Sequence, residues 1–264
     1  MSKLAKYLWN LKSNETLVDV LLVSAFNAEE EINLMPAIIF LGVLLISYLV
    51  GSIPFGLLIV KFKTGRDIRH VESGRTGGTN VMRAAGFWAG FATAMLDILK
   101  AFGSVYLARW LLPGNYWLEV LAPVMTILGH NYSIFLAERD QNGRLRLRGG
   151  AGGAPAVGGS AGIWFPVLAF IVPIGIFILY FIGYASLATL SVPVICILVF
   201  GYRAYTGAGP WEYVTYGVIT FLMLAWALRP NIQRLMNGTE RVIGYRARRR
   251  EKQSTQNKNN DQPG

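Results

Sequence analysis

Cysteine and histidine are scarce in this sequence, which has one cysteine and two histidines in 264 residues. A single cysteine excludes an intrachain disulfide, and Cys196 lies inside an apolar run, where a small packing residue is expected rather than a nucleophile. Because cysteine and histidine do not cluster, the sequence predicts no transition-metal site, and we expect no metal or other cofactor. Residues 1–34 contain charges and no small-residue cleavage site after an apolar core, so no cleaved signal peptide is predicted.

Charged residues are also few, at 15%, while 53% of the chain is hydrophobic and the mean hydropathy is +0.40. These values exclude an ordinary soluble domain. Apolar runs close to the length that crosses a bilayer recur between residues 36 and 228, which predicts an all-α polytopic membrane protein. The expected apolar segments are 36–60, 84–112, 116–137, 153–164, 165–182, 185–202 and 211–228.

Two of these segments are expected to be irregular. Pro54, in Gly51-Ser-Ile-Pro54, should break or kink the first helix and free backbone carbonyls. The stretch 153–182 is either one long tilted span or two short spans that fold at Trp164-Phe-Pro166.

Acidic residues are outnumbered by basic ones, 15 to 25, so the formal net charge is +10. The basic residues gather in the connections between apolar runs and in the tail. This distribution predicts no nucleic-acid partner; membrane lipid of the cytosolic leaflet and small anionic substrates are the expected partners.

Charge also decides the number of spans. Lysine and arginine number six in 61–83, four in 138–150 and nine in 229–264, against none in 113–117 and one in 202–210. Basic loops stay in the cytosol, and only an odd count places the three basic regions on one side. We therefore predict seven transmembrane helices, some short or broken, with cytosolic glycine-rich loops.

Composition divides the chain into three parts. Residues 1–34, with Glu29-Glu-Glu31 and three lysines, are predicted to be an N-terminal extension outside the membrane. Residues 35–242 form the predicted membrane domain. Residues 243–264 are predicted to be a basic, disordered cytosolic tail.

The polar stretch from Asp67 to Arg83 is the most informative part of the chain. Its glycines can direct backbone N–H groups at an anion, and its serine, threonine, asparagine and arginine side chains supply further donors. This pattern favours a phosphate pocket at the membrane surface. A positively charged loop that only fixes membrane orientation remains the alternative.

A second glycine cluster runs from Gly149 to Ala154. Glycines that open a helix turn N–H groups and the positive end of the helix dipole towards an anion. Small residues serve equally well for close helix packing, and the sequence does not decide between the two.

Two further groups of polar residues lie at apolar segments. Ser186 and Thr189 share a helical face, although such hydroxyls more often bond their own backbone. Asn231, Arg234 and Glu240 follow the last apolar segment, where they could bind substrate or cap the membrane interface.

Two ionisable residues, Asp97 and Lys100, are spaced for an i,i+3 ion pair within one span. We expect this pair to stabilise its helix rather than to form a wall of the polar cavity. His130 is expected to be a hydrogen-bonded structural residue in preference to a general base.

Together these pieces resemble the bacterial acyl-phosphate-dependent glycerol-3-phosphate acyltransferases, over residues 36–242. The matching motifs are Gly51-Ser-Ile-Pro-Phe-Gly56, Gly65-x-Asp-Ile-Arg69, Ser73-Gly74, Gly77-x-Thr-Asn-Val-x-Arg83, Asp97-x-x-Lys100, Leu128-Gly-His130, the glycine cluster, Ser186-Leu-Ala-Thr189 and Asn231-Ile-x-Arg-Leu-x-x-Gly-x-Glu240. The order and spacing of these motifs, more than any one of them, carry the resemblance.

The resemblance implies an enzyme of the bacterial inner (plasma) membrane, with its active site and C-terminus in the cytosol. Such enzymes move a fatty acyl group from acyl phosphate to the 1-hydroxyl of glycerol 3-phosphate and form lysophosphatidic acid. They need no metal, and the phosphate itself is thought to help accept the hydroxyl proton. Both substrates carry phosphate, so a pocket of arginine, serine, threonine and backbone donors suits both.

Carried over by motif, Ser73, Arg83, Thr189 and Asn231 are the expected catalytic residues. Ser73 and Arg83 match phosphate-contacting residues, Thr189 stands where the family has a substrate-contacting serine, and Asn231 matches an asparagine near the glycerol phosphate. The expected substrate-binding residues are Ser52, Arg69, Gly74, Arg75, Thr79, Asn80, Gly149, Gly150, Gly152, Ser186, Arg234 and Glu240.

The sequence departs from the family at two charged positions. Ala151 replaces a phosphate-binding lysine, and Leu228 replaces a histidine three residues before the motif asparagine. Losing a lysine from a desolvated phosphate site costs several kcal/mol unless another cation replaces it. Arg75, Arg146 and Arg148 are the candidate replacements, since arginine can bind phosphate through a bidentate fork.

Two further departures are Arg75 in place of an asparagine and Glu72 in place of a glycine. The first hypothesis is an active acyltransferase whose pocket charge is rebuilt around arginines. The alternatives are a non-catalytic lipid- or phosphate-binding paralogue, acyl transfer to another phosphorylated acceptor and, last, a transporter of an organic phosphate.

Overall fold

The structure is a computed structural model that describes residues 34–247. The predicted N-terminal extension and the arginine-rich part of the tail lie outside the described residues. The chain divides into two units between Ile38 and Ile39, and the site described below lies entirely within the unit from Ile39 onward.

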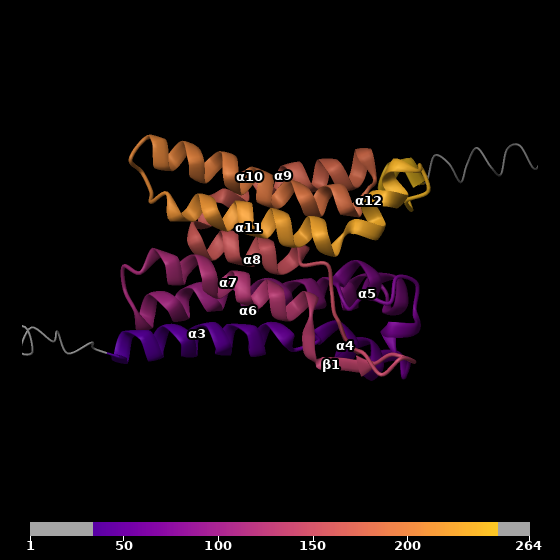
Figure 1. Cartoon of the computed structure of the whole chain (residues 1–264). Helices are drawn as coiled ribbons and strands as arrows, with labels where there is room; N and C mark the ends of the chain where they lie inside the picture. The colour runs from indigo at the N-terminus through magenta and orange to yellow at the C-terminus, as the bar shows by residue number, and fades with distance from the viewer. Residues whose placement is uncertain (1–33, 248–264) are drawn as a thin grey trace, which may run out of the picture. The chain divides into compact units, whose positions relative to one another are not determined.

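Helices make up most of the described chain (Figure 1). The α-helices are α3 (Leu34–Ser52), α4 (Phe55–Thr64), α5 (Gly78–Ala85), α6 (Phe87–Leu111), α7 (Tyr116–Asn131), α8 (Gly153–Ile163), α9 (Leu168–Phe177), α10 (Ala185–Tyr205), α11 (Glu212–Ala227) and α12 (Arg229–Met236). Short 3-10 segments lie at Ile68–His70 and Phe165–Val167, and a π-helical turn follows α9 at Ile178–Ile182. Within the unit from residue 39 onward, α6 packs on α7 and α8, and α10 packs on α11.

The prediction of a helical membrane protein is confirmed in its broad form. Four helical stretches in residues 34–247 are long and apolar enough to cross a membrane: Leu34–Thr64, Phe87–Leu111, Phe165–Ile182 and Ala185–Tyr205. The other segments expected to span are shorter, with 16 residues in α7, 11 in α8 and 16 in α11. An 11-residue helix rises only about 16 Å, roughly half the thickness of a bilayer core. The count of seven spans therefore stays a prediction.

The expected break at Pro54 is present, because α3 ends at Ser52 and α4 begins at Phe55. The carbonyl groups that lose their helical partners at this break accept hydrogen bonds from side chains elsewhere in the chain. Lys100 Nζ donates to the Gly51 carbonyl at 2.8 Å, and Ser133 Oγ donates to the Ser52 carbonyl at 2.6 Å. A helix end within the protein interior is thus capped by side chains of other elements, as a buried break requires.

The stretch 153–182 is not one continuous helix, because Trp164 takes an extended backbone between α8 and the 3-10 segment. The Arg109 guanidinium donates to the Gly162 and Ile163 carbonyls, both at 2.8 Å, and so caps the C-terminus of α8. Its Nε also pairs with Glu119 at 2.7 Å. This cap joins Arg109 to two residues that lie 53 and 54 positions later in the chain. No local sequence pattern predicted it.

Two expectations around residues 116–150 were wrong in detail. The apolar segment 116–137 is helical only to Asn131, and an antiparallel hairpin follows, formed by β1 (Ser133–Arg139) and β2 (Leu145–Arg148). The strict all-α class therefore gives way to a mostly helical fold with one small hairpin. Gly143, at a φ of 74°, donates to the Asp140 carbonyl in the turn, and Asn-Gly at this position is a hairpin signal.

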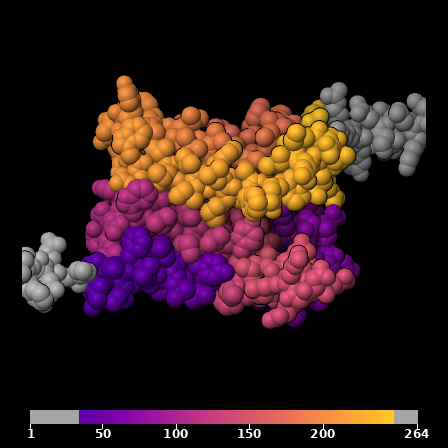
Figure 2. All heavy atoms as spheres, viewed as in Figure 1, coloured from indigo at the N-terminus to yellow at the C-terminus, as the bar shows by residue number. Residues whose placement is uncertain are grey.

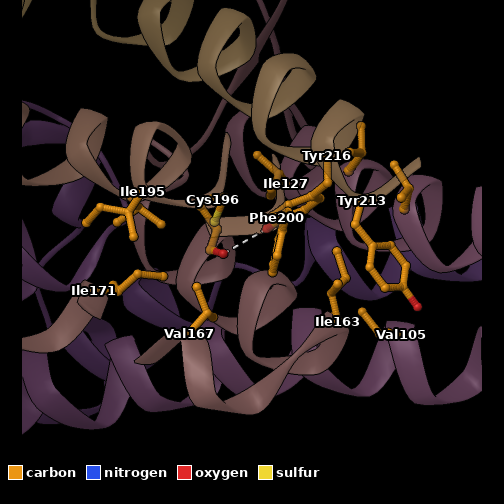
Figure 3. Packing of buried hydrophobic residues seen from close by; sticks show 14 of the residues in the cluster. Val105, Ile127, Ile163, Val167, Ile171, Ile195, Cys196, Phe200, Tyr213 and Tyr216 are labelled. Carbon is orange, nitrogen blue, oxygen red and sulfur yellow. Dashed lines mark hydrogen bonds between the residues drawn. The ribbon is translucent and has the colours of Figure 1, made fainter. Parts of the chain in front are cut away.

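The main core lies between α6, α7, α8, α9, α10 and α11 (Figure 3). Cys196 is fully buried there beside apolar neighbours, in agreement with the predicted packing role. Tyr216 is also fully buried, and its hydroxyl donates to the Ala156 carbonyl at 2.7 Å. This bond satisfies the one polar group that Tyr216 brings into the core.

Candidate active site

A cavity of about 520 Å³ opens where the loop before α5 meets the chain segments around α12. In Figure 2 the yellow C-terminal residues lie directly against the purple residues of this loop region. Two contacts join them: Arg75 Nη2 donates to the Ala227 carbonyl at 2.6 Å, and Arg241 pairs with Glu72 at 2.7 Å. The cavity is therefore assembled from segments more than 150 positions apart in the sequence.

Three helices present their N-terminal ends to this cavity. Its wall includes Gly77 to Thr79 at the start of α5, Gly152 to Ala154 at the start of α8, and Ala185 with Ser186 at the start of α10. The first N–H groups of a helix have no partner within it, and the helix dipole places partial positive charge there. Three such ends make the cavity suited to an anion such as phosphate.

All four residues predicted to be catalytic line this one cavity. Ser73 lies in the loop before α5, Arg83 in the last turn of α5, Thr189 in the first turns of α10 and Asn231 in α12. Four separate segments thus bring their predicted functional side chains to a common space. Contact of these residues with substrate stays a prediction.

The predicted substrate-binding residues divide into two groups. Those that line the cavity are Arg75, Thr79, Asn80, Gly152, Ser186, Arg234 and Glu240. Those outside its lining are Ser52, Arg69, Gly74, Gly149 and Gly150. Arg69, Gly149 and Gly150 of the second group contact other parts of the fold.

Arg69 connects the loop to the hairpin instead of facing the cavity. Its guanidinium pairs with Asp67 at 2.6 Å and with Glu138 of β1. The hydrogen bond from Arg69 lowers the pKa of Asp67 to about 2, so the Asp67 carboxylate stays ionised at physiological pH. These bonds fix one end of the loop that carries Ser73.

Glu240 and Asn80 position neighbouring polar groups in the cavity wall. The buried Glu240 carboxylate accepts from Ser186 Oγ at 2.7 Å and from Asn231 Nδ2 at 3.2 Å. Asn80 Nδ2 donates to the Val71 and Arg75 carbonyls at 3.0 and 2.8 Å. Both side chains therefore have structural partners in addition to their place on the cavity surface.

The glycine cluster is divided between close packing and the wall of the cavity. Gly152 and Gly153 line the cavity, whereas Gly149 and Gly150 pack against the end of α7. A Cβ atom on Gly150 would overlap the His130 imidazole, and one on Gly149 would overlap the His130 carbonyl oxygen. Gly149 and Gly150 are thus required by close approach, whereas Gly152 takes a left-handed backbone at a φ of 87° on the cavity wall.

A Gly150→Ala substitution is expected to lower the free energy of unfolding by about 1–3 kcal/mol, because the added methyl group must displace the His130 ring. Unfolding of the full chain in detergent measures this change. Gly103→Ala is the matched control, since Gly103 lies within α6 and a Cβ there meets open space. That control should be neutral or more stable by about 0.5–1 kcal/mol. Equal effects of the two substitutions would contradict the predicted overlap.

The inner wall of the cavity contains Asp97 and His130, which lie beside Lys100. Asp97 pairs with Lys100 at 2.8 Å, at the expected i,i+3 spacing. His130 Nδ1 lies 3.3 Å from the Asp97 carboxylate and 3.1 Å from Lys100 Nζ. The predicted ion pair is present, and Asp97 is also among the residues that line the cavity, so the two interpretations of Asp97 are compatible.

The sequence reading missed Arg241 as a cavity residue. Arg241 pairs with Glu72, which takes a left-handed backbone at a φ of 49°. No local pattern indicates this pair, because its members are 169 positions apart. Phe87 and Phe91 of α6 were also missed, and they give the cavity an apolar side.

Two arginine side chains in the cavity wall, Arg75 and Arg83, have lowered pKa values. Burial, together with the charge of Arg234, lowers the pKa of Arg75; burial and the charge of Arg241 lower that of Arg83. Within residues 34–247, neither Arg75 nor Arg83 pairs with a carboxylate. Ala151 and Leu228, which stand where the family has a lysine and a histidine, also lie on the cavity wall.

Comparison with known proteins gives a consistent picture. The glycerol-3-phosphate acyltransferase family model matches residues 41–238. A glycerol-3-phosphate acyltransferase of Thermus thermophilus is 35% identical over 207 residues, covering 78% of this chain and 96% of the relative. One of Desulfotalea psychrophila is 36% identical over 203 residues, covering 75% of this chain and 94% of the relative.

Two solved structures resemble this one. The glycerol 3-phosphate form of PlsY, an integral membrane glycerol 3-phosphate acyltransferase, matches with a TM-score of 0.66 and 30% identity, over 78% of this chain and 96% of PlsY. The lysophosphatidic acid form of PlsY matches with a TM-score of 0.64 and 29% identity, over 78% of this chain and 95% of PlsY. The family match, the long coverage and the shared fold agree, and the chain belongs to the glycerol-3-phosphate acyltransferase family.

Proposed function

We propose that this protein transfers a fatty acyl group from acyl phosphate to the 1-hydroxyl of glycerol 3-phosphate and so produces lysophosphatidic acid for phospholipid synthesis. One observation carries the proposal. Ser73, Arg83, Thr189 and Asn231, predicted from four separate motifs, line one cavity together with the N-terminal ends of three helices. Such a cavity suits substrates that both carry phosphate.

Each predicted residue has a role that fits its chemistry. Arg83 binds a phosphate through its guanidinium fork, and Ser73 adds a neutral donor beside it. The Thr189 hydroxyl contacts substrate at the start of α10. Asn231, positioned by Glu240, donates to the glycerol part of the acceptor.

The transfer requires no covalent enzyme intermediate, because the donor is already activated. The acceptor hydroxyl oxygen forms a bond to the acyl carbon, the bond from that carbon to the phosphate oxygen breaks, and inorganic phosphate leaves with the hydroxyl proton. Catalysis then consists of holding the hydroxyl next to the acyl carbon and stabilising the phosphate charge. Phe87 and Phe91 provide an apolar side along which an acyl chain can lie.

The arrangement in the membrane follows the charge distribution. We place the protein in the bacterial inner (plasma) membrane with seven spans, in a membrane domain of residues 35–242. The loop 61–83, the connection 138–150 and the tail 243–264 face the cytosol, where basic segments are retained. The cavity then opens to the compartment that contains glycerol 3-phosphate.

One observation favours a second candidate function. Ala151 and Leu228 place uncharged side chains on the cavity wall at family positions that bear a lysine and a histidine. A paralogue that binds lipid or phosphate without acyl transfer, or one that acylates another phosphorylated acceptor, would tolerate these changes.

Acyl transfer by the purified full chain decides between these functions. The assay combines palmitoyl phosphate with radiolabelled glycerol 3-phosphate in detergent micelles and follows lysophosphatidic acid and released phosphate. Equal amounts of both products support the proposal. Phosphate release without labelled lipid, restored by another phosphorylated alcohol, indicates a different acceptor. No product from a preparation that elutes as a folded species supports the non-catalytic paralogue.

A further inference from the structure

The cavity contains more cationic side chains than one phosphate group needs. Arg75, Arg83, Arg234 and Arg241 all line it. Arg241 is the one among the four that pairs with a carboxylate within residues 34–247, through Glu72 at 2.7 Å. Glu240 also lines the cavity, but Ser186 and Asn231 bond to it. Arg75, Arg83 and Arg234 therefore share one cavity without an ion pair to a carboxylate in this part of the chain, although the charge of Glu72 acts on Arg83.

These arginines interact electrostatically in two pairs, Arg83 with Arg241 and Arg75 with Arg234. Arg241 pairs with Glu72; burial and the positive charge of Arg241 lower the pKa of Arg83, whereas the charge of Glu72 raises it. Arg75 is held at the junction of α11 and α12 by its 2.6 Å bond to the Ala227 carbonyl. Burial, and then the charge of Arg234 in the last turn of α12, lower the pKa of Arg75, and both arginines line the cavity.

Like charges held at short range are stabilised when an anion binds between them. A phosphate group carries up to two negative charges and several acceptor oxygens, and arginine binds it bidentately. Arg75 thus supplies a fixed cation in a cavity where Ala151 carries no charge.

We propose that Arg75 and Arg234 form a second phosphate subsite, so that the cavity holds two phosphate groups at once, one here and one at Arg83. This inference rests on the proposed function, in which both substrates carry phosphate. The phosphate at the second subsite belongs either to the acyl donor or to glycerol 3-phosphate, and separate kinetics distinguish the two sources.

The kinetic experiment measures KM for palmitoyl phosphate and for glycerol 3-phosphate separately, in the full chain and in Arg75→Gln and Arg234→Gln. Each substitution should raise KM for the same substrate by about 10- to 100-fold, as loss of a charge-assisted hydrogen bond to phosphate predicts. KM for the other substrate should stay within about threefold. The substrate affected identifies the source of the phosphate.

Two control substitutions and one conservative variant sharpen the test. Arg66→Gln lies in the same loop as Arg75, Arg229→Gln lies in α12, and neither residue lines the cavity. Both controls should leave the two KM values unchanged. Arg75→Lys keeps the charge without the fork and should recover part of the affinity. Equal changes in both KM values, or no change in either, would overturn the proposed subsite.

Binding of inorganic phosphate tests the subsite without relying on catalysis. Equilibrium dialysis of the full chain with radiolabelled inorganic phosphate should reveal two binding sites in the wild type and one in Arg75→Gln. Gel filtration in detergent confirms that each variant is folded. A wild type that binds two phosphates but forms no lipid would overturn the proposed function and retain the subsite. A wild type that binds a single phosphate would overturn the subsite even if it transfers acyl groups.

Discussion

An Arg83→Ala variant is expected to lose nearly all acyl transfer, with kcat/KM lower by about 10²- to 10³-fold, as is typical when a preorganised donor to a reacting anion is removed. Arg83 lies half-buried on the cavity wall. Burial and the charge of Arg241 lower its pKa, whereas the charge of Glu72 raises it, so an anion bound beside Arg83 would stabilise the charged guanidinium. Steady-state transfer from palmitoyl phosphate measures the loss.

The matched variants separate charge from geometry. Arg83→Lys keeps a cation without the bidentate fork and should retain an intermediate activity. Arg66→Ala removes an exposed arginine from the neighbouring loop, outside the cavity lining, and should leave kcat/KM unchanged. Activity of Arg83→Ala within about threefold of the wild type would show that Arg83 does not bind the reacting phosphate.

The largest expected change in stability comes from Asp97→Ala. Asp97 and Lys100 have side chains that are 2% exposed, and they pair at 2.8 Å. Removing the carboxylate leaves a buried ammonium group without its counter-ion, which costs about 3–5 kcal/mol of unfolding free energy. It also deprives His130 of a neighbour at 3.3 Å. Equilibrium unfolding of the full chain in mixed detergent micelles measures the loss.

A double substitution tests whether the lost pairing is the cause. Replacing both members, as in Asp97→Ala with Lys100→Met, removes the unpaired charge and should recover a large part of the stability. Full recovery is not expected, because Lys100 also donates to the Gly51 carbonyl at the break between α3 and α4. Single and double variants of equal stability would contradict the assignment of Asp97 as the counter-ion.

Structural features that depend on residues close together in the sequence could be predicted from the sequence. Long apolar runs with few charges indicated membrane helices, because no unpaired backbone is tolerated in lipid. Pro54 predicted the break between α3 and α4, and the spacing of Asp97 and Lys100 predicted their ion pair. Motif order indicated four catalytic residues that do line one cavity, although their substrate contacts await experiment.

The hairpin shows how a local signal can be outweighed. Residues 133–137 are apolar enough to continue the preceding helix, so the sequence predicts one apolar segment from 116 to 137. The structure ends α7 at Asn131 and pairs β1 with β2, since the Asn-Gly turn at 142–143 allows the chain to return. Arg69 of the loop before α5 then pairs with Glu138 of β1.

Local sequence therefore established the helical membrane class and the broken first helix, and it predicted phosphate binding by the loop before α5, because periodicity, proline and side-chain chemistry act over a few residues. Three features depend on the tertiary structure: the separate roles of Gly150 and Gly152, the pair of Glu72 with Arg241, and the position of Arg75 at Ala227. Each requires segments far apart in the chain to meet at the ends of packed helices. The packing of the helices determines these long-range contacts, and the spacing of residues along the sequence does not predict them.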